Sequence, residues 1–131
     1  MTLSPQEQAL VQAARAARAH AYAPYSNYSV GAAVLTSDGR IFTGCNVENA
    51  SYGLTVCAER VAVFSAVAAG AREVVTVAVC TPDGATPCGA CRQVLAEFVP
   101  DLSACPVLVV KPDAFVARYT LAELLPHHFG R

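Results

Sequence analysis

The strongest constraint on the fold is the placement of three cysteines and one glutamate in two short segments. The first segment reads Cys57-Ala-Glu59, and the second reads Pro87-Cys88-Gly-Ala-Cys91. Two cysteines separated by two residues can direct both sulfurs at one tetrahedral zinc ion, at about 2.3 Å each. If Cys57 supplies a third sulfur, the fold must bring the two segments together, although they lie far apart in the sequence.

The same residues predict a metal centre with one open position. Three thiolates leave the fourth tetrahedral position of zinc for water, and an open position distinguishes catalytic zinc sites from structural ones. Glu59 lies two residues after the first ligand and is placed to move the protons of that water. Thiols and a glutamate in this order are the pattern of zinc-dependent deaminases. We therefore expect one zinc ion per chain and hydrolytic deamination, with Glu59 as the catalytic residue.

Two other interpretations of the cysteines remain open. A lone Cys-x-x-Cys also occurs as a redox pair. In a non-catalytic, zinc-stabilised interaction module, a fourth protein ligand such as Cys45 or Cys80 would close the site, and Glu59 would be dispensable. The Cys-Ala-Glu segment upstream and Pro87 before the pair favour the catalytic site over both alternatives.

Two arginines are candidates to draw charge off the sulfurs. Three thiolates give zinc a net negative charge, which makes it a poor Lewis acid unless other groups donate to the sulfurs. Arg60 lies three residues after Cys57, on the same face of an expected helix, and Arg92 follows Cys91 directly. We expect both arginines to donate to cysteine sulfur. The alternative for each is a solvated surface arginine.

The pattern of apolar residues predicts an α/β fold, a three-layer α/β/α sandwich with a mixed five-stranded sheet, in a single domain covering residues 1–131. Ser4-Pro5-Gln6-Glu7 combines a helix cap, a proline in the first turn and a capping box. Asp38-Gly39 between two apolar runs predicts a hairpin. The expected helices are 4–21, 57–69, 88–98 and a short one beginning at 120, and the expected strands are 30–35, 41–47, 74–80, 107–110 and 115–119. In this arrangement two positive helix ends converge on the metal and favour thiolates.

The composition limits the partners. Nucleic-acid binding requires clustered basic residues, but the net charge is −1 and Lys111 is the single lysine, so we expect a small neutral ligand and no polynucleotide. Hydrophobic residues make up 54% of the chain and charged residues 15%, and we expect part of this apolar surplus to be buried between subunits. An alanine-rich composition without special meaning is the alternative.

The six cysteines allow a disulfide framework, but the sequence favours reduced thiols. The N-terminus lacks the basic start and apolar run of a secretory signal, so we expect a reduced, cytoplasmic protein. Cys45, Cys80 and Cys105 lie in or beside apolar stretches, where a free thiol packs as a small hydrophobic group. The longest apolar stretch, Val61 to Ala69, is too short to span a bilayer, and we expect no membrane contact.

Several further segments between about His20 and Gly130 accompany the zinc motif in a fixed order. The set is Ala21-Tyr-Ala-Pro-Tyr-Ser26, Val30-Gly-Ala-Ala33, Gly44-Cys-Asn-Val-Glu-Asn-Ala-Ser51, Cys57-Ala-Glu-Arg60, Pro87-Cys-Gly-Ala-Cys-Arg-Gln93 and Glu123-Leu-Leu-Pro126. Through these segments, which together are more specific than the zinc motif alone, the chain resembles the cytidine deaminases of the small, homotetrameric, three-cysteine zinc type.

The resemblance implies deamination of cytidine and 2′-deoxycytidine in pyrimidine salvage, with Cys57, Cys88 and Cys91 as zinc ligands and Glu59 as proton shuttle. It implies that further residues contact the substrate, some of them from a neighbouring subunit of a homotetramer. Asn46 and Glu48 would bind the ribose hydroxyls, and Phe129 and Tyr52 would lie at a pocket shared between subunits. Tyr28 stands where the family usually has phenylalanine against the pyrimidine ring, so its hydroxyl needs a partner or water. The implied substrate-binding residues are Tyr28, Asn46, Glu48, Tyr52, Ala58 and Phe129.

Other deaminases remain as alternatives, because a shared zinc core is weak evidence for the substrate. A deaminase of an aminonucleoside antibiotic of the blasticidin type has a similar core, but the ribose motif from Asn46 to Ser51 argues against it. A deaminase of RNA or DNA bases is opposed by the lack of a basic surface and by the short chain.

Overall fold

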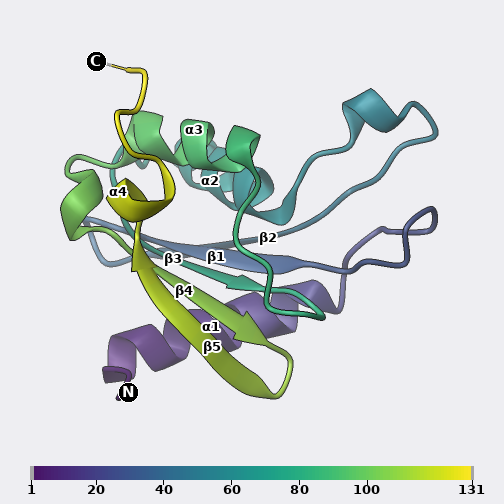
Figure 1. Cartoon of the computed structure of the whole chain (residues 1–131), viewed down its shortest axis with the longest axis horizontal. Coiled ribbons are helices and arrows are strands. Elements are labelled where there is room, and N and C mark those ends of the chain that lie inside the picture. Colours follow the sequence, from purple (N-terminus) through teal and green to yellow (C-terminus); the bar gives the residue numbers. More distant parts are fainter. Residues whose placement is uncertain (1, 131) are drawn as a thin grey trace.

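One mixed sheet separates two layers of helices. The structure is a computed structural model and describes residues 2–130. Figure 1 shows α1 (Pro5–Arg18) against one face of the sheet, and α2 (Ala58–Ala68) and α3 (Gly89–Phe98) against the other. Each face carries its own cluster of buried apolar side chains. The expected α/β/α sandwich is therefore confirmed.

The sheet has five strands in the order β2-β1-β3-β4-β5, and only the β3–β4 pair is parallel. The sheet is thus mixed, as expected. The strands are β1 (Gly31–Thr36), β2 (Ile41–Cys45), β3 (Val74–Cys80), β4 (Pro106–Lys111) and β5 (Ala114–Thr120). The short helical turns are η1 (Tyr52–Leu54), η2 (Leu102–Ala104) and α4 (Leu121–Leu124).

Two elements end two or three residues before the expected position. The first helix ends at Arg18, three residues before the expected end, because the amides of His20 and Ala21 bond three residues back and form a turn. Strand β2 ends at Cys45, since the side-chain amide of Asn46 bonds the backbone of Tyr28 and Val30, which lie just before β1. Both differences lie at element ends, where local hydrogen bonds compete with the regular ladder.

Local capping fixes where two of the helices begin. The Ser4 hydroxyl accepts a bond from the Glu7 amide at 3.1 Å, and the Glu7 carboxylate accepts one from the Ser4 amide at 3.0 Å, which forms the expected capping box. Thr120 and Glu123 make the same exchange at the start of α4. The Glu7 carboxylate also pairs with Arg118 at 2.7 Å, which joins α1 to β5.

Gly44 lets β2 approach the first turn of α2. A methyl group at this position would lie 2.5 Å from the carbonyl oxygen of Ala58 and 2.5 Å from the amide nitrogen of Ala62. No side chain fits there without displacing the backbone of α2. The absence of a side chain at Gly44 therefore lets α2, whose N-cap is Cys57, lie close against β2.

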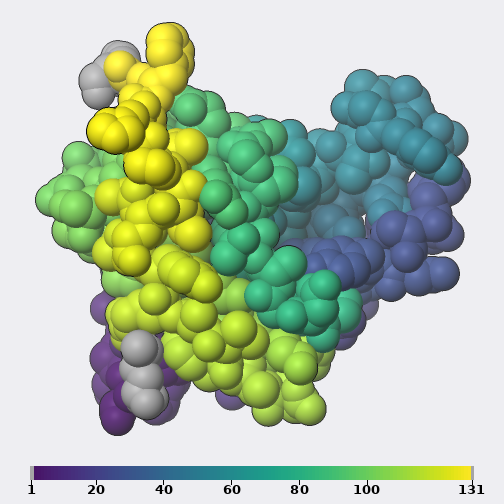
Figure 2. All heavy atoms as spheres, viewed as in Figure 1, coloured from purple at the N-terminus to yellow at the C-terminus, as the bar shows by residue number. Residues whose placement is uncertain are grey.

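Two segments project together from the sandwich. They are residues 20–29 and 46–56, which are joined by bridges from Val47 to Tyr22 and to Val56. Figure 2 shows them as a lobe beside the main body, and we call this lobe the arm. Tyr25 and Tyr52 pack edge to face on it, with ring centroids 5.7 Å apart. Several large apolar side chains of the arm are exposed, namely Tyr22, Tyr25, Val47, Tyr52 and Leu54.

No helix within residues 2–130 combines the length and the apolar character needed to cross a membrane.

Candidate metal centre and active site

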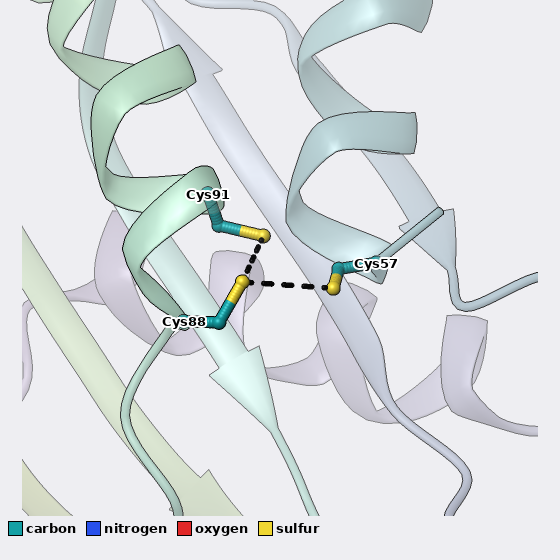
Figure 3. A group of neighbouring side chains, drawn as sticks. All are labelled: Cys57, Cys88 and Cys91. Atoms are coloured by element: carbon teal, nitrogen blue, oxygen red, sulfur yellow. Dashed lines mark hydrogen bonds between the residues drawn. The ribbon is translucent and has the colours of Figure 1, made fainter. Parts of the chain in front are cut away.

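The three cysteines meet at the starts of two helices. Cys57 is the N-cap of α2, Cys88 is the N-cap of α3, and Cys91 lies in the first turn of α3. The Sγ atom of Cys88 lies 3.8 Å from that of Cys57 and 3.5 Å from that of Cys91. Figure 3 shows the three side chains pointing toward one another from the two helices.

The donor set fits zinc. Sulfurs bound at about 2.3 Å to one tetrahedral ion lie about 3.8 Å apart, which agrees with the spacing observed here. All three sulfurs lie within 4.8 Å of one another, and no other group of three or more potential ligands was found in residues 2–130. Neither Cys45 nor Cys80 belongs to the group, and all six cysteines are free. Three protein ligands leave one tetrahedral position for water.

Arg60 makes the expected contact with a cysteine. Its Nη2 donates to the Sγ of Cys57 at 3.3 Å, from one helical turn further along α2. The pKa of Cys57 is lowered to about 5, because its sulfur is hydrogen-bonded by Cys91 and by Arg60. The pKa of Cys91 is raised by its bond to Cys57 and by burial. Because of these contacts, Cys57 loses its proton more readily than Cys91 does.

Arg92 has partners different from those expected. Its Nε donates to the carbonyl of Pro87 at 2.7 Å, its Nη1 to the carbonyl of Leu124 at 2.7 Å, and its Nη2 to the Thr86 hydroxyl at 2.9 Å. All three acceptors are oxygens, and none of these bonds reaches a cysteine sulfur, so the expectation of a donor to sulfur is wrong. Arg92 instead links the segment before Cys88 to the end of α4 through hydrogen bonds.

Glu59 lies in the first turn of α2 with only 4% of its surface exposed. Burial raises the pKa of its carboxyl group to about 7, and the nearby Cys57 acts in the same direction. A carboxyl group with a pKa near neutrality can both accept and release a proton under ordinary conditions. An ordinary glutamate on the surface of a helix is not buried, and its pKa is not raised in this way.

Tyr28 is half buried, and its ring packs against the core cluster that contains α2 and α3. Its hydroxyl donates to Oδ1 of Asp83 at 2.5 Å. Burial, followed by the bond to Asp83, raises the pKa of this phenol, and the charge of Glu59 contributes in the same direction. The family that the sequence resembles usually has phenylalanine at this position. The additional hydroxyl of Tyr28 is thus bonded to a protein partner, Asp83.

The two residues expected at the ribose hold the backbone around Tyr28. Asn46 is buried, and its side chain accepts from the amide of Val30 at 2.9 Å and donates to the carbonyl of Tyr28 at 2.8 Å. The Glu48 carboxylate accepts from the amides of Tyr25 and Ser26 at 2.9 and 3.2 Å, and from the Ser26 hydroxyl. Glu48 also lines an open cavity of about 270 Å³ with Tyr25, Ser26, Tyr52 and Thr55.

The remaining expected substrate-binding residues differ in accessibility. Ala58 is completely buried between Cys57 and Glu59, with its carbonyl against Gly44. Tyr52 is 73% exposed on the arm, and Phe129 is 86% exposed near the C-terminus. The carbonyl of Phe129 accepts a bond from the side chain of Gln93 on α3 at 2.9 Å. Within one chain, therefore, neither aromatic ring is covered.

Two residues near the site were missed in the sequence. Asp83 holds the Tyr28 hydroxyl, and Ser26 binds the Glu48 carboxylate. Asp83 lies in Thr81-Pro82-Asp83-Gly84, which has the composition of an ordinary turn. Only the position of Tyr28 opposite this turn in the folded sheet marks it as part of the site.

A three-layer α/β/α fold with three thiols and a buried glutamate at two converging helix starts defines the class of zinc-dependent deaminase domains. The comparison with known proteins is more particular. Residues 4–105 match the sequence model of the cytidine and deoxycytidylate deaminase zinc-binding region, and the chain belongs to this family.

Individual relatives agree over nearly the whole chain. A cytidine deaminase of Halalkalibacterium halodurans is 48% identical over 124 residues, which cover 93% of this chain and 92% of the relative. A cytidine deaminase of Sporosarcina psychrophila is 44% identical over 93% of this chain and 90% of the relative. The crystal structure of cytidine deaminase from Burkholderia pseudomallei superposes with a TM-score of 0.88 at 48% identity, covering 98% of this chain and 100% of that one. The family resemblance seen in the sequence is confirmed.

Proposed function

We propose that this protein is a zinc-dependent cytidine deaminase, which hydrolyses cytidine and 2′-deoxycytidine to uridine and 2′-deoxyuridine with release of ammonia. The observation that carries the proposal is the cluster of Cys57, Cys88 and Cys91 beside the buried carboxyl group of Glu59. It occurs in a chain that is 48% identical to a cytidine deaminase over almost its full length.

Zinc held by Cys57, Cys88 and Cys91 would supply a water molecule whose pKa is lowered toward neutrality. Replacing the amino group at C4 by oxygen requires the water oxygen to lose two protons, one of which goes to the ring nitrogen and the other to the departing amine. Glu59 takes each proton from the oxygen and delivers it to one of these two nitrogens, so that it ends the cycle in its starting state. Its burial keeps bulk water from competing for these protons.

The substrate would lie between the metal ligands and the base of the arm. Tyr28 offers a ring against which the pyrimidine can pack, and Asn46 and Glu48 offer polar atoms for the ribose hydroxyls. Ala58, which has no exposed side chain, would contribute through its backbone only. Glu48 retains free lone pairs, since each carboxylate oxygen accepts more than one bond.

We also propose a homotetramer with active sites shared between subunits. The proposal is supported by the exposed apolar surface of the arm and by the exposed rings of Tyr52 and Phe129, which a single chain leaves uncovered. Such an assembly would bury part of the apolar surplus in the composition. A sedimentation measurement that gave a stable monomer at working concentration would contradict it.

The cellular setting is inferred from composition. Zinc binding requires the thiols to stay reduced, which fits a cytoplasmic, single-domain enzyme of pyrimidine salvage. The net charge of −1 and the single lysine support a small-molecule substrate and no nucleic-acid partner.

The loss of cytidine's ultraviolet absorbance on adding purified protein tests the proposed function. We expect conversion to uridine, and we expect a zinc chelator to abolish it, because the water is activated only on the metal. No conversion by protein that carries one zinc per chain would contradict the proposal. Aminonucleosides of the blasticidin type would then be tested, and failure with these would make the structural zinc module the leading interpretation.

Replacing Arg60 by glutamine is expected to lower deaminase activity about tenfold or more with the fold retained, because such partners of metal ligands contribute 10- to 100-fold. The substitution removes the charge beside the Cys57 sulfur, so the thiolates donate more charge to zinc. Arg72→Gln is the matched control, since Arg72 is exposed beyond the end of the same helix and bonds backbone carbonyls. A normal rate for Arg60→Gln would make Arg60 a merely structural residue.

A further inference from the structure

The bond between Tyr28 and Asp83 continues the sheet where its backbone ladder stops. Strands β1 and β3 pair antiparallel, and the last pair at this end is Gly31 with Cys80. The same register carried three residues further places Tyr28 opposite Asp83. The two side chains meet there, with the phenol oxygen 2.5 Å from Oδ1 of Asp83.

Asp83 belongs to the segment that leads from β3 to the metal ligands. Its carboxylate also accepts a bond from the Thr81 hydroxyl at 3.3 Å, and that hydroxyl accepts one from the amide of Ala85 at 2.8 Å. Asp83 is therefore held in a defined turn shortly before Cys88. The bond to Tyr28 is the main cause that lowers the pKa of the Asp83 carboxyl group, followed by bonds from the turn itself.

The backbone of Tyr28 is held by bonds to other residues. The backbone carbonyl of Tyr28 accepts from the Asn46 side chain at 2.8 Å, and its amide donates to the Ser26 hydroxyl at 3.0 Å. The bond to Asp83 then fixes the far tip of the ring. A tyrosine held at both ends has one ring orientation, whereas a phenylalanine at this position would be held only by packing.

We propose that Asp83 is a positioning residue that holds the Tyr28 ring against the substrate's pyrimidine. The bond commits the only proton of the Tyr28 hydroxyl to Asp83, so the ring meets the substrate with its apolar face and not as a donor. The same bond links Tyr28, on one side of the substrate, to the segment that leads to Cys88 and Cys91. The role in substrate binding rests on the proposed function, but the tether itself does not.

A double-mutant cycle of Asp83→Ala and Tyr28→Phe on the zinc-loaded enzyme tests the proposal. We expect Asp83→Ala to raise the KM for cytidine about fivefold with kcat changed less than about twofold, because a loosened ring weakens binding of substrate and transition state alike. Tyr28→Phe should match it, and the double variant should be no worse than either single one. Asp83→Asn should restore most of the affinity, since its amide oxygen still accepts the bond.

The control is Asp101→Ala, which removes another exposed aspartate that accepts bonds within its own turn, beside η2. It should leave KM unchanged. Equal effects of Asp83→Ala in the Tyr28 and Tyr28→Phe backgrounds would overturn the proposal, because Asp83 would then act through its turn. An unchanged KM in the single variant, or a loss confined to kcat, would overturn it as well.

Near-ultraviolet circular dichroism separates a failed tether from a failed function. The chain has no tryptophan and five tyrosines, so this signal reports tyrosine environments. Asp83→Ala should change the spectrum of the parent protein and leave that of Tyr28→Phe unchanged. If these spectra were observed but the parent protein did not turn over cytidine, the proposed function would be contradicted and the tether would stand. No spectral change in the parent protein would overturn the tether whatever the activity.

Discussion

Replacing Glu59 by glutamine is expected to abolish nearly all turnover of cytidine while zinc stays bound. Glutamine keeps the shape of the side chain but cannot take a proton from water or return one to the ring nitrogen and the amine. Loss of a positioned acid–base group costs about 10²–10⁴-fold in rate, and here one group serves several transfers. The measurement is the turnover number together with the zinc content of the purified variant.

The fold should tolerate this substitution. Burial raises the pKa of Glu59 to about 7, so the ionised carboxylate is the form that the folded protein disfavours, and a neutral amide removes that cost. Glu73→Gln is the matched control, because Glu73 is exposed in the loop before β3. Turnover retained in Glu59→Gln with zinc present would remove Glu59 from the proton relay.

The contrast between Arg60 and Arg92 shows what helical spacing can and cannot predict. Arg60 lies one turn after Cys57, so the two side chains share a face of α2 and meet, as expected. Arg92 is adjacent to Cys91, and neighbours on a helix point about 100° apart. Its side chain is thus directed away from the sulfurs, toward Pro87 and Leu124. Adjacency to Cys91 in the sequence therefore did not predict the contacts of Arg92, whereas helical periodicity predicted the contact of Arg60.

The elements with strong local signals were predictable, and contacts between distant segments were not. The capping box at Ser4 and the turn at Asp38-Gly39 act within a few residues, so the sequence determines them. The bond from Tyr28 to Asp83 depends on the pairing of β1 with β3. The metal ligands are the exception among distant contacts, because their chemistry requires that they meet.

Replacing Cys88 by alanine is expected to remove both the zinc and the activity. Two thiols and water hold the ion far more weakly than three thiols, since each ligand contributes directly to the binding free energy. Cys88 is exposed, so its truncation leaves no cavity in the core. The same change at Cys91, which is buried, would mix loss of metal with loss of packing. Metal analysis and the cytidine assay on the same preparation measure the two effects.

Cys45→Ala is the control that separates ligands from ordinary thiols. Cys45 is a free, half-buried cysteine at the end of β2 and lies outside the cluster, so its loss should leave zinc content and turnover unchanged. The Cys88 variant should also unfold at a lower temperature than the zinc-loaded parent, because metal bound only by the folded state stabilises it. Normal zinc content in Cys88→Ala would refute the ligand assignment. Loss of zinc in Cys45→Ala would instead indicate a fourth protein ligand and a closed, structural site.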